Sequence, residues 1–307
     1  MTDVLSSSSS ILFARKCTEN QLRDYVVTFP MRIVWVSAYT QEECVSYLDK
    51  TSYMDIFFMQ LLPYGNLLPW LKHQKMRIHL VNTEQMSRYN TETKHSESVF
   101  FPFDTFIFDG LRGETPLCCT LWDYSARNLE MAKKHVSRQL NLRLFCFKPI
   151  NYYKKKQDFD ASLKQKNCVF IGDASSKYRQ KAIQQIASLV DIDVVTNLFG
   201  PQRDLKLLQY KILVNVHYAP SYCVFEEMRC LPCLLTNTII VSEDSLLDPK
   251  HPIAEFIIFS PYDSLHERVQ EVLKNYEFYY ELFFVQKKKQ LEHLVDAITT
   301  YEQSFSI

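Results

Sequence analysis

The second half of the chain repeats one pattern, a short continuous apolar run followed by a stretch with helical periodicity. Runs that are apolar at every position are typical of strands buried on both faces, as in a parallel sheet covered by helices. The expected strands are Cys168–Ile171, Asp193–Thr196, Lys211–His217, Thr238–Val241 and Glu255–Phe259. The expected helices are Lys177–Leu189, Arg203–Tyr210, Cys223–Leu235, Ser264–Asn275 and Tyr279–Tyr301. This alternation predicts an α/β fold.

The first half carries weaker signs of the same alternation, with strand-like runs at Arg32–Ser37, His79–Asn82, Phe106–Asp109 and near Leu117–Trp122. A lysine-rich stretch at residues 153–166 then indicates an exposed connection. A chain of 307 residues can hold two α/β domains, each with its own core. We predict one Rossmann-like domain over residues 1–150 and a second over residues 151–307, whose last helix packs back on the first.

Composition excludes several classes of protein. Acidic and basic residues number 35 each, so no net field indicates a nucleic-acid or acidic-membrane partner. No stretch approaches the roughly 20 apolar residues of a membrane span. The nine cysteines have irregular spacings and no secretory signal accompanies them, which indicates reduced thiols. We therefore expect a soluble, cytoplasmic protein with no nucleic-acid partner and no membrane span.

Polar residues cluster where the predicted strands end, and ligands of open parallel sheets bind outside those carboxyl ends. After the first strand of the second half come Gly172, Lys177 and Arg179. A glycine allows close approach of the backbone to a ligand, and cations at a helix N-terminus can meet phosphate oxygens. The alternative is an ordinary strand-to-helix turn, because one glycine is neither a dinucleotide fingerprint nor a P-loop.

Two further strand ends add candidates. Arg203 follows Gly200 after the second strand, and His217 closes the third, although His217 is equally well read as a satisfied core histidine. Glu226 and Arg229 are three residues apart in a predicted helix, hence on one face. A carboxylate can accept both hydroxyls of a ribose, and an arginine can pair with phosphates or hold that carboxylate. The alternative is a surface ion pair.

The order of these motifs resembles that of the glycosyltransferases encoded by large algal and amoebal DNA viruses, including the chlorella-virus type. The matching strings of the second half are Phe170-Ile171-Gly172, Phe199-Gly200 with Arg203-Asp204, Asn215-x-His217, Phe225-Glu226-x-x-Arg229 and Val241-Ser242-Glu243. Those of the first half are Asn82-Thr83-Glu84-Gln85 and Trp122-Asp123-Tyr124-Ser125-x-x-Asn128. The resemblance spans roughly residues 80–245.

The resemblance implies a GT-B-like enzyme, with two Rossmann-like domains facing a cleft. Such an enzyme moves a sugar from a nucleotide-sugar donor to a hydroxyl of a glycan or glycoprotein acceptor, without a cofactor, and Glu226 takes the place of the residue that binds the donor ribose. The viral relation favours a UDP-sugar, with UDP-xylose as first choice, and a role in capsid glycan synthesis. Leu231-Pro232-Cys233 departs from the glycine-rich stretch of the broader cellular pattern.

The predicted site has two parts. The donor-binding residues are Gly172, Lys177, Arg179, Arg203, His217, Glu226, Arg229 and Ser242. Cations and helix N-termini would stabilise the negative charge that develops on the leaving diphosphate. If the reaction inverts the anomeric centre, a group of the first domain must deprotonate the acceptor. Glu84 and Asp123 are the candidates for that catalytic base, and the alternative is that each ties loops together.

Two further residue patterns have the spacing of known metal or redox sites, and two other functions are compatible with an α/β fold. Asp191-Ile192-Asp193 matches the Asp-x-Asp with which some glycosyltransferases hold Mn²⁺, but it precedes a strand instead of following one, so we predict a metal-independent enzyme with no metal site. Cys230 and Cys233 have redox or zinc spacing without a second pair, which favours buried thiols. An oxidoreductase would need the missing glycine fingerprint. A non-catalytic nucleotide- or glycan-binding module of the same fold remains the alternative.

Overall fold

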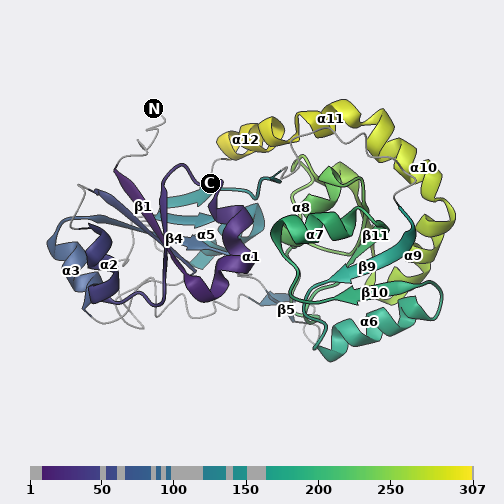
Figure 1. Ribbon diagram of the computed structural model, residues 1–307, viewed down its shortest axis with the longest axis horizontal. Coiled ribbons are helices and arrows are strands. Elements are labelled where there is room, and N and C mark those ends of the chain that lie inside the picture. The colour runs from purple at the N-terminus through teal and green to yellow at the C-terminus, as the bar shows by residue number, and fades with distance from the viewer. Residues whose placement is uncertain are drawn as a thin grey trace. The chain divides into compact units, whose positions relative to one another are not determined.

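The computed structural model describes residues 9–48, 53–60, 66–83, 88–90, 95–97, 120–135, 141–150 and 164–305. The chain divides into two compact units, shown in Figure 1. Unit 1 comprises Met1–Ser87, Ser98–Cys146 and Phe305–Ile307, and unit 2 comprises Arg88–Glu97 and Phe147–Ser304. Each unit contains its own parallel sheet, so the predicted α/β class is confirmed.

The sheet of unit 1 has the strand order β2-β1-β3-β4-β7-β8, with every neighbouring pair parallel. Its strands are β1 (Ser10–Arg15), β2 (Arg32–Val36), β3 (Asp55–Met59), β4 (Arg77–Asn82), β7 (Thr120–Asp123) and β8 (Asn141–Leu144). Its helices are α1 (Glu19–Val26), α2 (Gln41–Leu48), α3 (Leu67–His73) and α5 (Ala126–His135). Strands β1 and β3 were not expected from the sequence, yet both are buried along almost their whole length and form the middle of the core.

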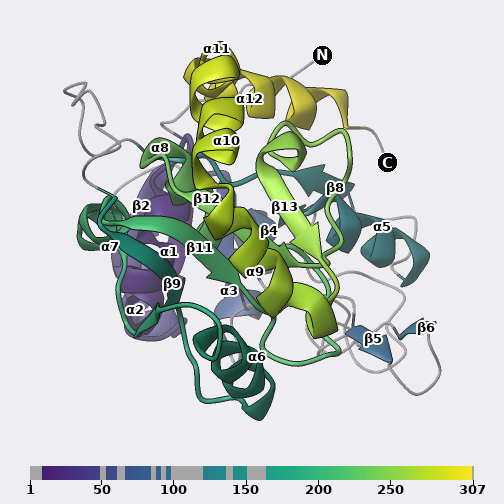
Figure 2. The same ribbon diagram turned by 90° about the vertical axis from the view of Figure 1, so that its right-hand side faces the viewer.

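The sheet of unit 2 has the order β10-β9-β11-β12-β13, again with every pair parallel. Its strands are β9 (Lys166–Ile171), β10 (Ile192–Val195), β11 (Tyr210–Asn215), β12 (Ile239–Glu243) and β13 (Ile257–Ser260). Its helices are α6 (Lys177–Ala187), α7 (Gly200–Leu207), α8 (Glu227–Leu235) and α9 (Leu265–Lys274). Helix α6 packs beside α9, and α7 beside α8 (Figure 2). The five strands predicted for this half are all present, with shifted ends.

The strand order of unit 2 reverses once, between β9 and β11. The chain leaves β9 outward to β10 and then returns past β9 to form β11 on its other side. In doubly wound sheets the connections diverge at such a switch point and leave a crevice outside the carboxyl ends of the two strands. In unit 2 that place is flanked by Gly172 after β9 and by Val216 after β11.

The C-terminal helix is interrupted. In place of the single helix expected over Tyr279–Tyr301, the structure has α10 (Tyr276–Tyr280), a π-helical segment (Glu281–Gln286), α11 (Lys288–Glu292) and α12 (Leu294–Ser304). The wider π turn accompanies the burial of two adjacent phenylalanines, Phe283 and Phe284. The remaining elements are 3₁₀ turns at Lys16–Thr18, Ala254–Phe256 and Tyr262–Ser264 and the antiparallel pair β5 (Arg88–Asn90) and β6 (His95–Glu97). No helix in the described ranges is both long and apolar enough to cross a membrane.

Candidate functional site

Arg179 joins the two strand ends at the switch point of unit 2. Its Nε donates to the carbonyl of Val216, after β11, at 2.9 Å, and its Nη1 donates to the carbonyl of Asp173, after β9, at 2.8 Å. The side chain is only 4% exposed. It starts from the first turn of α6, which is capped by Ser176, whose hydroxyl accepts from the Arg179 amide. The cap and the two carbonyls hold the guanidinium in one place.

Glu226 lies between two arginines. Its Oε1 is 3.0 Å from Arg179 Nη2, and its Oε2 is 2.5 Å from Arg229 Nη2. The ion pair foreseen as the alternative to a ribose role is therefore present, but it includes a second, buried arginine. A carboxylate has about four acceptor positions. The 21% exposed side chain of Glu226 thus keeps acceptor capacity on both oxygens for the hydroxyls of a ligand.

The position of Glu226 differs from the one predicted. Helix α8 begins at Glu227, and Glu226 is its N-cap residue, with φ −87° and ψ 75°. The sequence had placed both Glu226 and Arg229 inside a helix beginning at Cys223. Residues before Glu226 pair instead with a loop, since Val224 forms a β-bridge with Leu246. The carboxylate therefore extends from the turn before the helix, beside the carboxyl ends of the strands.

Gly172 makes room for Arg229. A Cβ atom on Gly172 would lie 3.0 Å from Arg229 Nη2, and the residue has a φ of +149°, which L side chains rarely adopt. The sequence suggested that this glycine lets a ligand approach the backbone. In the structure the guanidinium of Arg229 occupies the space, so Gly172 acts on the site through that arginine.

Asn215 and Ser242 orient the same arginine. Arg229 Nη1 donates to Asn215 Oδ1 at 3.0 Å, and Asn215 Nδ2 donates to Ser242 Oγ at 3.0 Å. The Ser242 hydroxyl gives its single proton to the carbonyl of Glu243 at 2.7 Å, so it must accept from Asn215. This fixes the amide with its oxygen toward Arg229. Ser242 was predicted to bind the donor directly; it is 0% exposed and reaches the site through Asn215.

The two guanidinium groups are close enough to repel. Both of their carbons lie 5.4 Å from the centroid of the buried Phe170 ring. Burial, and after it the charge of Arg229, lowers the pKa of Arg179. Arg179, Arg229 and Glu226 together sum to one positive charge, and the exposed Asp173 carboxylate also interacts with both guanidinium groups. An arrangement of this kind at a strand's carboxyl end is suited to bind an anion.

His217 belongs to a neighbouring network. Its backbone amide donates to Glu243 Oε2 at 3.0 Å, and its Nε2 is 3.0 Å from the Ser245 hydroxyl. The residue is 1% exposed, and its Nδ1 has no hydrogen-bond partner within the described part of the chain. Glu243 also accepts from the Tyr178 hydroxyl, and burial raises the pKa of this carboxyl. The sequence did not identify Tyr178, Glu243 and Asn215 as candidate site residues. Glu243 and Asn215 nevertheless lie in two of the motifs that carry the viral resemblance.

Two other predicted donor residues have different surroundings. Lys177 is the exposed first residue of α6. Arg203 lies in α7, is 7% exposed and pairs with Asp204 at 2.8 Å. Its charge helps to lower the pKa of the Cys233 thiol, which burial raises to about 12. The structure therefore places Arg203 near Cys233 instead of with the arginines of the switch point.

Of the two candidates for the catalytic base, only Asp123 lies within the described residues; Glu84 lies outside them. Asp123 ends β7 and is 0% exposed. Its carboxylate accepts from Asn82 Nδ2 at 2.6 Å, from the Ser125 amide at 2.8 Å and from Asn128 Nδ2 at 3.1 and 3.2 Å. Burial raises the pKa of Asp123 to about 7, while these hydrogen bonds lower it. The contacts tie the end of β4 to the start of α5.

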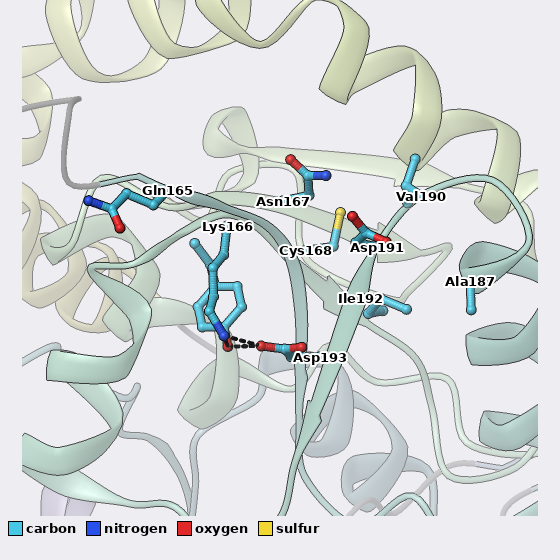
Figure 3. Close-up of a pocket in the computed structure, with 10 residues that line it drawn as sticks. Gln165, Lys166, Asn167, Cys168, Ala187, Val190, Asp191, Ile192 and Asp193 are labelled. Carbon is cyan, nitrogen blue, oxygen red and sulfur yellow. Dashed lines mark hydrogen bonds and ion pairs between the residues drawn. The ribbon is translucent and has the colours of Figure 1, made fainter.

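The Asp-x-Asp sits at the opposite end of the same sheet. A cavity of about 490 Å³ lies beside the first residues of β9 and β10, and Figure 3 shows the residues that line it. There the Asp193 carboxylate is 2.6 Å from Lys166 Nζ and accepts from the Tyr210 hydroxyl. Asp191 is exposed. The acidic pair thus lies at the amino ends of the strands, away from the ends where Arg229 is found.

Cys230 and Cys233 are free thiols with 0% exposure. Burial raises the pKa of both, to about 12 for Cys233. Thiols that stay protonated in an apolar helix are poor nucleophiles and poor metal ligands. The prediction of buried thiols is confirmed.

Sequence comparison finds relatives in a virus of amoebae and no matching family model. The protein R358 of Acanthamoeba polyphaga mimivirus is 23% identical over 256 residues, covering 81% of this chain and 82% of R358. The protein L137 of the same virus is 31% identical over 185 residues, covering 58% of this chain and 24% of L137. Both are uncharacterised. The predicted resemblance to proteins of large amoebal viruses holds for these relatives, and the chlorella-virus type stays a prediction.

Several solved structures that resemble the chain along its length are those of glycosyl-transferring enzymes. Sucrose-phosphate synthase of Thermosynechococcus elongatus has a TM-score of 0.56 at 10% identity, covering 96% of this chain and 98% of its own. The β-glucosyltransferase of phage T4 has a TM-score of 0.53 at 11% identity, and the match covers 96% of this chain and 98% of the T4 enzyme. HepE of Anabaena, in complex with UDP-glucose, has a TM-score of 0.51 at 10% identity, and the match covers 96% of this chain and 100% of HepE. The chain has the GT-B fold of two Rossmann-like domains.

Proposed function

We propose that this protein is a glycosyltransferase whose nucleotide-sugar donor binds at the switch point of unit 2. The observation that carries the proposal is the group formed by Arg179, Glu226 and Arg229 at the carboxyl ends of β9 and β11. It combines acceptor capacity for ribose hydroxyls with guanidinium groups that can pair with a diphosphate. The GT-B fold supports the assignment, because that fold occurs in transferases such as the T4 β-glucosyltransferase.

The proposed reaction gives each part of the site a task. Glu226 holds the ribose, and Arg229, with the exposed Lys177, faces the diphosphate. An acceptor hydroxyl attacks the anomeric carbon and gives its proton to a base, while the bond from that carbon to the phosphate oxygen breaks. Negative charge then develops on the diphosphate, where preorganised cations stabilise it. The N–H groups of Arg179 already donate to two carbonyls and to Glu226. Arg179 therefore holds the group together and is not assigned a contact with the diphosphate.

The donor and the acceptor are narrower proposals. UDP is the nucleotide proposed first, since HepE was solved with UDP-glucose. UDP-xylose remains the first choice of sugar, and a hydroxyl of a glycan or glycoprotein, in capsid glycan synthesis, remains the proposed acceptor. Glu84 remains a candidate for the catalytic base. Asp123 is the weaker candidate, because its carboxylate is buried and engaged in hydrogen bonds to three neighbours.

We propose further that transfer needs no divalent metal. Asp193 is held by Lys166 and Tyr210 at the other end of the sheet. The positive charge near the proposed diphosphate position comes from arginines. Transfer should therefore persist in EDTA, and a strict Mn²⁺ requirement, restored by titration, would contradict this part of the proposal.

A thermal-shift panel tests the function directly. The ligands are UDP, GDP and sugars of each nucleotide, with EDTA or with Mn²⁺, followed by an assay for UDP release. A ligand at about 100 times its Kd stabilises the native state by about 2.7 kcal/mol. For a domain of this size that corresponds to a rise in Tm of about 5–10 °C. UDP and its sugars should give that rise in both buffers. If no nucleotide raises Tm, the proposal is wrong; binding without UDP release in the presence of acceptors would favour a non-catalytic module.

A further inference from the structure

An exposed aromatic ring stands at the same strand end as the arginine group. Tyr218 follows His217 after β11 and is 41% exposed. The guanidinium carbon of Arg179 lies 5.4 Å from the centroid of the Tyr218 ring, and Tyr222 meets this ring edge-on at 6.1 Å. The ring is therefore fixed by a cation and a second ring, while part of it faces solvent.

The contacts link these groups one to the next. Glu226 uses Oε2 for Arg229 and Oε1 for Arg179, and Arg179 lies over Tyr218. The sequence of groups is thus cation, carboxylate, buried cation, aromatic ring. A nucleoside diphosphate has a matching sequence of phosphates, ribose and flat base. With the ribose on the carboxylate, the base and the phosphates must lie on opposite sides of it.

The exposed fractions of the two arginine side chains indicate which of them contacts the phosphates and on which side the base lies. The side chain of Arg229 is 15% exposed, whereas that of Arg179 is 4% exposed and bound to two backbone carbonyls. Arg229 is the arginine that phosphates can reach. The base then lies toward Arg179, where the exposed surface is the ring of Tyr218.

We propose that Tyr218 is the platform on which the nucleobase of the donor stacks. This inference rests on the proposed function, because it takes the ribose to lie on Glu226. Stacking of a base on an aromatic side chain depends little on which base is present. Tyr218 therefore supplies affinity for the nucleoside part of a nucleoside diphosphate and leaves the choice between uracil and guanine to other groups.

A structural role for the ring has a different signature. If Tyr218 only covers Arg179, its loss disturbs the arginine group and weakens every anion equally. If Tyr218 stacks the base, its loss weakens UDP and leaves inorganic pyrophosphate, which has no base, unaffected. The two ligands together therefore separate the two roles.

The test is calorimetric titration of the full chain with UDP and with pyrophosphate. Tyr218→Ala should lose about 5- to 150-fold in UDP affinity and keep its pyrophosphate affinity. Tyr218→Phe keeps the ring and should bind UDP like wild type. Phe278→Ala, at a ring that is 64% exposed on α10 of the same unit, is the matched control and should also match wild type. The uracil protons of bound UDP should show an upfield NMR shift that Tyr218→Ala abolishes.

Each contrary result is distinct. Unchanged UDP affinity in Tyr218→Ala, or equal losses for UDP and pyrophosphate, overturns the stacking role and leaves the proposed function standing. A wild-type chain that binds none of UDP, GDP, ADP and CDP overturns the proposed function and the stacking role together.

Discussion

A missing side chain at Gly172 leaves the space in which Arg229 lies. The sequence showed a glycine at a strand end, and a glycine there is compatible with a ligand, a turn or a neighbouring side chain. Only the folded chain shows that the neighbour is a guanidinium from a residue 57 positions later (229 − 172). The same holds for Asn215, whose amide orientation depends on Ser242 in the adjacent strand. Sequence identifies the residue types, and cross-strand contacts assign their tasks.

Gly172→Ala should therefore weaken UDP binding and lower stability. Its Cβ would meet Arg229 Nη2 at 3.0 Å, and a φ of +149° strains any L residue, which costs about 1–3 kcal/mol. Gly200→Ala is the control, because Gly200 also has a positive φ, of 57°, but lies at the start of α7. Calorimetry should show reduced UDP affinity for Gly172→Ala only. Equal affinity in both variants would mean that Gly172 does not hold Arg229 in its binding position.

At the level of elements, apolar periodicity located the strands of unit 2 and misjudged several ends. Helix α8 was predicted four residues too early because the apolar pattern continues upstream of it. Those residues are extended instead, since Val224 bridges to Leu246 and the Phe225 amide bonds the Leu246 carbonyl. Such pairing with a distant loop has no signature in local sequence. Strand β1 was missed for a related reason, as its short apolar run looked unremarkable without its partners β2 and β3.

His251, in the loop before β13, should make the stability of the fold depend on pH. His251 is 4% exposed, packs on Tyr301 of α12 and accepts from the Ile253 amide through Nδ1. Burial lowers the pKa of His251 to about 4, below the ordinary value of 6.5. The unfolded chain then binds a proton more readily, so stability is present above pH 6.5 and is lost as pH falls toward 4. Between pH 7 and pH 5 the loss is about 2 kcal/mol.

Denaturant unfolding at the two pH values checks this. His251→Asn keeps an acceptor near the Nδ1 position and should lose about 2 kcal/mol of the pH dependence. His293→Asn, at a histidine whose side chain is 76% exposed, should keep the wild-type dependence. A His251→Asn variant with an unchanged pH dependence would show that His251 titrates normally in the folded state.

For the whole molecule, the described residues of the proposed donor site all belong to unit 2. Their contacts come from α6, α8 and the ends of β9, β11 and β12. The α/β class was predictable from the sequence, because continuous apolar strands alternate with helices, whereas the GT-B expectation came from the resemblance to viral glycosyltransferases. The first half was less predictable; one of its expected strands, Phe106–Asp109, lies outside the described residues.

A fragment should therefore retain donor binding. The fragment comprises residues 147–304 and includes Lys148, because Lys148 forms an ion pair with Glu302 of α12 at 2.8 Å. This fragment should bind UDP within about tenfold of the full chain, a difference of about 1.4 kcal/mol. A fragment of residues 9–146 should not bind it. Binding of UDP by the fragment of residues 9–146 alone would reverse the assignment of the donor to unit 2.

Glu226 is the residue on which the proposed donor site depends most, and a matched control must be a carboxylate that can be replaced without disturbing the fold. Glu227, the adjacent carboxylate, is 2% exposed and 3.8 Å from His251, so replacing it would disturb folding. Glu255 is the better control, because its side chain is partly exposed. It forms an ion pair with Lys287 at 2.8 Å, in a different part of unit 2. Glu226→Gln will also lower stability, because Glu226 pairs with two arginines, so binding must be measured well below Tm.

The measurement is isothermal titration of UDP-glucose in EDTA into wild type, Glu226→Gln and Glu255→Gln. Loss of a charge-assisted hydrogen bond costs about 1.5–3 kcal/mol, or about 10- to 150-fold in affinity. Glu226→Gln should show that loss with the fold intact, and Glu255→Gln should bind like wild type. Equal affinity of Glu226→Gln and wild type would contradict the proposed ribose contact, because the carboxylate would then serve the ion pairs alone.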